Sequence, residues 1–183
     1  MILYLHGFAS CGDSAKTRLL KEYFGEGEIY SPDLPVRPGR AVAFIDAVIR
    51  EKKADLLIGS SLGGFYASYF CEKYGIKTVL INPSTEPHIT LEPYVGINSF
   101  WCSGEPFVWK RSYLEELKAY CIDTVKEPSS YLLLLQKGDE VLDYRIALQK
   151  YEGAELFLQE GGNHRFENLH AYLEEIKSFR EKR

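Results

Sequence analysis

Six short apolar runs alternate along the chain with longer segments of helical periodicity. The apolar runs span residues 2–5, 28–31, 55–59, 77–81, 131–136 and 155–159. Short and nearly continuous runs of this kind are typical of strands buried on both faces, as in parallel sheets. Helical patterns occupy residues 14–24, 41–51, 62–74, 142–151 and 166–180. The alternation predicts right-handed βαβ units and an α/β fold: a doubly wound, mainly parallel sheet of about six strands with helices on both faces.

Residues 84–130 depart from this alternation. The stretch has no convincing strand, one plausible helix at 111–120, several prolines and both tryptophans, Trp101 and Trp109. Because long insertions in compact domains usually serve a function, we expect a lid or a binding loop here. The alternative is an irregular surface excursion whose aromatic side chains only pack on the sheet.

Composition narrows the class of protein. The 183 residues carry a net charge of -4, with 45% hydrophobic and 26% charged residues, which suits one domain over residues 1–183. No run of Lys and Arg marks a nucleic-acid partner. The apolar start ends at once in His6-Gly7, and no uncharged run approaches the ~20 residues of a membrane span, so we expect a cytoplasmic protein without membrane insertion.

The four cysteines are scattered and form no C-x-x-C pair. Neither a zinc site nor a redox motif is therefore indicated. We expect free thiols that act as small apolar side chains, and no metal.

The third apolar run leads directly into Gly59-Ser60-Ser61-Leu62-Gly63-Gly64, which contains G-x-S-x-G between a predicted strand and a predicted helix. This context indicates a nucleophile elbow with Ser61 as the nucleophile. The glycines allow a sharp turn that leaves the serine strained at the strand tip and at the helix N-terminus.

A glycine-rich turn without chemistry is the alternative. A phosphate-binding P-loop is not supported, because Phe65 stands where its lysine belongs. Ser60 lies off the centre of the motif.

A serine nucleophile needs a base, and four histidines are available. His164 follows the last predicted strand in a glycine-containing loop, so we assign it as general base. His6 follows the first strand and is expected to brace a loop; His88 lies in the insertion, and His170 on the surface of the last helix.

The base in turn needs a carboxylate that fixes its tautomer. Asp139 lies just past the fifth strand and is favoured over Asp143, which falls in the following helix. Either aspartate could instead be an N-cap or first-turn residue. The order Ser, Asp, His is the one that nucleophile-elbow hydrolases use.

Two backbone N–H groups are candidates for an oxyanion hole: that of Phe8, after His6-Gly7, and that of Leu62, after the nucleophile. In an open sheet, ligands bind beyond the carboxyl ends of the strands at the switch in strand order. If the order is 2-1-3-4-5-6, Phe8 and Ser61 should meet there.

The chain resembles the small bacterial α/β-hydrolases known as YqiA-like esterases over nearly its whole length. The resemblance rests on I-L-Y-L-H-G-F-A-S at 2–10, S-P-D-L-P at 31–35, I-G-S-S-L-G-G at 58–64, I-N-P-S at 81–84, L-L-L-Q-K-G-D-E-V-L-D-Y at 133–144 and E-G-G-N-H-R-F at 160–166. It implies an α/β-hydrolase fold, the triad Ser61, Asp139 and His164, activity on acyl esters or thioesters, and no cofactor. Residues 86–127 match least clearly.

These observations predict a serine carboxylic-ester hydrolase that acts through an acyl-enzyme on a small-molecule substrate. The alternatives are a thioesterase or another hydrolase with the same triad, and a non-catalytic binding module. Aromatic side chains of the insertion are expected to line an apolar acyl site, namely Phe100, Trp101, Phe107 and Trp109. The sequence makes no prediction of the oligomeric state.

Overall fold

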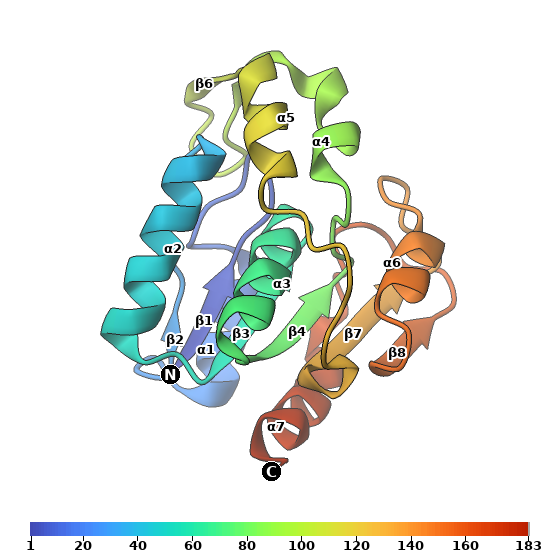
Figure 1. The fold of residues 1–183 in the computed structure, drawn as a ribbon. Coiled ribbons are helices and arrows are strands. Elements are labelled where there is room, and N and C mark those ends of the chain that lie inside the picture. The colour runs from blue at the N-terminus through green and yellow to red at the C-terminus, as the bar shows by residue number, and fades with distance from the viewer. Residues whose placement is uncertain (183) are drawn as a thin grey trace.

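A computed structural model describes residues 1–182, with a parallel sheet at its centre (Figure 1). The strands lie in the order β2-β1-β3-β4-β7-β8. Their bounds are β1 Ile2–Leu5, β2 Ile29–Tyr30, β3 Leu56–Ser60, β4 Lys77–Ile81, β7 Tyr131–Gln136 and β8 Glu155–Gln159. Every neighbouring pair in this sheet is parallel. The predicted six-stranded α/β sheet and its strand order are therefore confirmed.

Helices cover both faces of the sheet (Figure 1). On one face lie α2 (Pro38–Lys52), α3 (Leu62–Tyr74) and α6 (Tyr144–Lys150). On the other lie α1 (Ala15–Phe24) and α7 (Leu173–Glu181). A hydrophobic core lies on each face of the sheet. Residues that alternate along a strand contribute to one core or the other, because successive side chains of a strand point to opposite faces. The central strands are buried along their whole length, which explains their continuous apolar sequence.

Two predicted helices begin later than expected. Asp143 is the N-cap of α6 and accepts a hydrogen bond from the Arg145 N–H, so it stands before the helix rather than in it. The last helical pattern does not begin at Phe166, whose φ of 53° is left-handed. Between Phe166 and α7 the chain instead forms a 3₁₀ helix at Leu169–Tyr172 (η3).

The prediction that residues 84–130 contain no strand is wrong. The segment folds as α4 Pro87–Thr90, η1 Glu92–Tyr94, β5 Gly96–Ser99, β6 Pro106–Trp109, α5 Arg111–Lys118 and η2 Pro128–Ser130. Strands β5 and β6 pair as an antiparallel hairpin. The hairpin was hard to recognise because each strand has four residues and its outer face is apolar, with Ile97 81% and Val108 52% exposed.

The insertion lies over the carboxyl ends of the strands, at the end of the molecule opposite the two termini (Figure 1). Its inner face packs into the core through Phe107 and Trp109. The hairpin tip is also tied to the loop after β1, because the Trp101 N–H donates to the Ala9 carbonyl at 2.8 Å. Among the helices between Met1 and Lys182, none is long and apolar enough to cross a membrane.

Candidate active site

Ser61 stands at the turn between β3 and α3, as the sequence predicts. Its φ of 54° and ψ of -122° place it in a strained region that a non-glycine residue adopts rarely. Glycines surround it because the turn is crowded. A Cβ at Gly59 would meet the Gly63 backbone, one at Gly63 would overlap the Leu5 carbonyl, and one at Gly64 would lie 2.7 Å from the Pro83 Cβ. The turn at Ser61 is thus strained and crowded, as the G-x-S-x-G pattern predicts.

Three side chains from separate loops form a hydrogen-bonded chain. Ser61 Oγ lies 3.0 Å from His164 Nε2, and His164 Nδ1 lies 2.8 Å from Asp139 Oδ2. The Asp139 side chain is 2% exposed and that of His164 is 20% exposed. The aspartate is therefore shielded from solvent, while the imidazole is partly accessible. An Nδ1–H that donates to Asp139 leaves Nε2 free to accept the serine proton.

Backbone groups orient Asp139. Its Oδ1 accepts the N–H groups of Val141 and Leu142, each at 2.8 Å. Asp143, the rival in the sequence, instead caps α6 and pairs with Arg145. The other histidines do not bond Ser61: the closest polar partner of His88 is Cys121 Sγ at 3.7 Å, and His170 is exposed at the surface.

The His164 loop is held by three residues, Asn82, Gln136 and Glu140, that no catalytic motif of the sequence marks. Asn82 donates to the Asn163 carbonyl at 3.1 Å, and Gln136 Oε1 accepts the Asn163 N–H at 2.9 Å. Glu140 accepts the His164 N–H at 2.9 Å, and this bond lowers the pKa of Glu140 below its usual value. Asn82 and Gln136 could have been noticed, because each is a polar residue at the carboxyl end of an apolar run.

The loop after β1 lies against Ser61. A Cβ on Gly7 would stand 3.1 Å from the Ser61 Cβ, which places the neighbouring Phe8 beside the elbow. Leu62 opens α3, where an N–H has no acceptor within its own helix. Within residues 1–182, the Phe8 N–H has no hydrogen-bond acceptor. The meeting of Phe8 and Ser61 at the switch between β1 and β3 is as predicted.

His6 braces this loop, as expected. Its Nδ1 lies 2.9 Å from the Gly7 carbonyl, and its Nε2 accepts the Leu34 N–H at 3.0 Å. Both nitrogens are therefore engaged in the neutral ring. Burial lowers the pKa of His6 below its usual value, which keeps the ring neutral.

A cavity of about 620 Å³ opens over Ser61. Its walls comprise Ser61 and His164, the loop residues Phe8 and Leu142, and residues of the insertion that include Phe100 and Trp101. Of the two tryptophans predicted to line an acyl site, only Trp101 lines this cavity. Trp101 is 80% exposed at the rim of this cavity, whereas Trp109 is 1% exposed and lies in the core behind Phe8.

The strand order and the strained strand-to-helix turn at Ser61 are those of an α/β-hydrolase fold. Solved structures with low sequence identity share it. Mouse alpha/beta hydrolase domain-containing protein 10 superposes with a TM-score of 0.73 at 17% identity, over 97% of this chain and 88% of that one. Est1E from Butyrivibrio proteoclasticus, solved with bound ferulic acid, gives 0.70 at 17% identity over 97% and 86%.

The family follows from the sequence comparison. The profile described as "Uncharacterised protein family (UPF0227)" matches residues 1–181, and the chain belongs to this family. A UPF0227 protein of Serratia proteamaculans is 26% identical over 192 residues, which covers 98% of both chains. A relative from Yersinia pseudotuberculosis is 25% identical over 190 residues, with the same coverage.

Proposed function

We propose that the protein is a serine hydrolase of carboxylic esters. The observation that carries the proposal is the chain of hydrogen bonds from Ser61 Oγ through His164 to Asp139, at 3.0 and 2.8 Å. It stands at a strained elbow below an accessible cavity. A buried serine network with a purely structural role would need neither the strain nor the access.

The reaction proceeds in two halves. Ser61 Oγ attacks the ester carbonyl carbon while His164 Nε2 takes its proton, and Asp139 stabilises the imidazolium. The N–H groups of Phe8 and Leu62 stabilise the negative oxygen of the tetrahedral intermediate. The C–O bond to the alcohol then breaks, and His164 returns its proton to the leaving alkoxide oxygen.

Water completes the cycle. His164 Nε2 accepts a proton from a water molecule as its oxygen attacks the acyl-serine carbonyl. Collapse of the second tetrahedral intermediate releases the carboxylic acid and returns the proton to Ser61. The positive end of the α3 dipole, which begins at Leu62, favours both oxyanions.

The test is hydrolysis of p-nitrophenyl acetate, butyrate, octanoate and palmitate by the wild type, Ser61→Ala and Ser60→Ala. Ser60 is the matched control, because it is the adjacent hydroxyl in β3 and lies outside the hydrogen-bonded chain. We expect Ser61→Ala to lose at least about 1,000-fold in kcat/KM and Ser60→Ala to retain activity.

Covalent labelling gives an independent measurement. An alkyl fluorophosphonate should add its phosphonyl mass to the wild type and to Ser60→Ala, but not to Ser61→Ala. A folded wild type that hydrolyses no ester and takes no label would refute the proposal and favour a binding module on this fold. A butyryl thioester run beside the butyryl ester separates esterase from thioesterase.

A further inference from the structure

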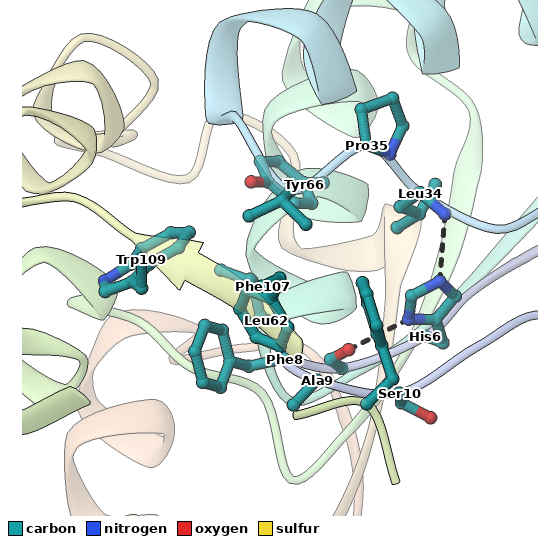
Figure 2. A pocket seen from close by; sticks show the side chains of 13 residues that line it. His6, Phe8, Ala9, Ser10, Leu34, Pro35, Leu62, Tyr66, Phe107 and Trp109 are labelled. Atoms are coloured by element: carbon teal, nitrogen blue, oxygen red, sulfur yellow. Dashed lines mark hydrogen bonds between the residues drawn. The ribbon is translucent and has the colours of Figure 1, made fainter. Parts of the chain in front are cut away.

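A second, smaller cavity of about 30 Å³ lies behind the loop after β1 (Figure 2). Its walls are mostly apolar and include Leu34, Val36, Tyr66, Phe107 and Trp109. Neither Ser61 nor His164 lines it. The small cavity thus lies beside the candidate active site without belonging to it.

The Phe8 side chain stands between the two cavities. Phe8 lines both of them. Its ring centroid lies 5.4 Å from that of Tyr94, a wall of the large cavity, and 5.1 Å from that of Trp109, a wall of the small one. Figure 2 shows Phe8 beside Phe107 and Trp109, and the Phe107 ring is 5.6 Å away. Ala9, Leu62 and Phe100 also line both cavities, but the Phe8 ring is the part of this shared wall that contacts aromatic rings on both sides, and it forms the partition between the cavities.

The direction of the acyl group follows from the proposed chemistry. His164 must protonate the leaving oxygen, so the alcohol part of the ester lies on the His164 side, next to Val141 and Leu142. The acyl chain points the other way, past Phe8 and Leu62. Both of these residues also line the small cavity, so an acyl chain that extends in this direction meets the Phe8 ring.

We propose that the side chain of Phe8 determines the acyl-chain length that the enzyme accepts. The inference rests on the proposed esterase function and adds a specificity-determining residue to it. The backbone N–H of Phe8 serves the oxyanion, while the ring closes the acyl site and blocks the apolar space in front of Trp109. Removing the ring joins the two cavities and gives a longer chain an apolar path.

The measurement is the ratio of kcat/KM for p-nitrophenyl octanoate to that for the butyrate. A general effect of substitution on the oxyanion hole cancels in this ratio, because both esters share the same reacting atoms. Each methylene that becomes buried favours binding by about fourfold. We expect Phe8→Ala to raise the ratio by at least about tenfold and Phe8→Leu to raise it by less.

Tyr113→Ala is the matched control. Tyr113 belongs to the same aromatic cluster, with its ring 5.4 Å from that of Trp109, but lines neither cavity. Its removal loosens the cluster without opening the partition, so the ratio should stay at the wild-type value.

The outcomes are distinct. An unchanged ratio in folded and active Phe8→Ala and Phe8→Leu variants overturns the inference, as does an equal rise in Tyr113→Ala. If Phe8→Ala does not fold, Phe8→Leu, which keeps a large apolar side chain, decides alone. A wild type that neither hydrolyses esters nor takes the fluorophosphonate label defeats the proposed function instead, before the ratio can be measured.

Discussion

Asp139 and Asp143 have different hydrogen-bond partners although they are close in sequence. Asp139 accepts hydrogen bonds from His164 and from two backbone N–H groups, while Asp143 caps α6. Both are aspartates at the start of one loop-to-helix segment, so only geometry separates their roles. Substituting each aspartate in turn therefore tests the proposed triad, with Asp143 as the matched control for Asp139.

Asp139→Asn should lower kcat by about 1,000- to 10,000-fold, because an amide at this position favours the wrong imidazole tautomer. Asp143→Asn should keep kcat near the wild-type value, since asparagine is also a good N-cap. Steady-state kinetics on a p-nitrophenyl ester measures both. Equal losses in the two variants would contradict the assignment of Asp139.

His6 makes stability depend on pH. Burial lowers its pKa in the folded protein, so the unfolded chain binds a proton at a higher pH than the folded one does. This contribution to the free energy of unfolding is present above the unfolded pKa of about 6.5 and is lost as the pH falls below it. Protonation also removes Nε2 as the acceptor for the Leu34 N–H.

Urea unfolding at about pH 5 and pH 7 measures this effect. The wild type should lose more stability at the lower pH than His6→Asn does, and His6→Asn should be about 1–3 kcal/mol less stable than the wild type at pH 7. His170→Asn is the control, because His170 is exposed and should leave the pH dependence unaltered. An identical pH dependence in His6→Asn would exclude His6 as its source.

At the scale of elements, the unit β3–elbow–α3 tolerates little change. A Cβ on Gly63 would overlap the carbonyl oxygens of Leu5, the last residue of β1, and of His6 after it, so helix α3 approaches the end of β1 closely there. Backbone atoms, unlike the ends of long side chains, cannot move aside without disturbing the sheet.

Gly63→Ala should therefore lower the free energy of unfolding by about 3 kcal/mol or more and reduce activity with it. Gly27→Ala is the matched control, because no atom lies within 4 Å of a Cβ built there. Thermal unfolding of the two variants gives the comparison. A Gly63→Ala protein as stable as the Gly27→Ala protein would show that α3 can shift.

At the scale of the whole molecule, the sheet could be predicted because its central strands are apolar and buried along their whole length. The hairpin β5–β6 could not, because Ile97 and Val108 face outward and reverse the usual pattern. Asp139 was favoured because it follows a predicted strand directly, although Asp143 also stands outside its helix as an N-cap. The role of Glu140 in holding the His164 loop could not be predicted, since it depends on a contact between distant segments.

The surroundings of the two tryptophans, Trp101 and Trp109, also could not be predicted from the sequence. Both belong to one aromatic-rich stretch, from which the sequence predicts that both line the acyl site. One stands at the rim of the large cavity and the other behind Phe8, because adjacent parts of a hairpin can face opposite surroundings. Whether Trp109 ever meets an acyl chain then depends on the Phe8 partition.

The order of the three site residues along the chain has a consequence for protein synthesis. Ser61 leaves the ribosome first and His164 last, and the loop that carries His164 is held between β8 and the segment that leads into α7. A nascent chain thus exposes an ordinary, unactivated serine hydroxyl until the C-terminal segments dock. Hydrolytic activity during translation should accordingly appear in a single late step rather than grow with chain length.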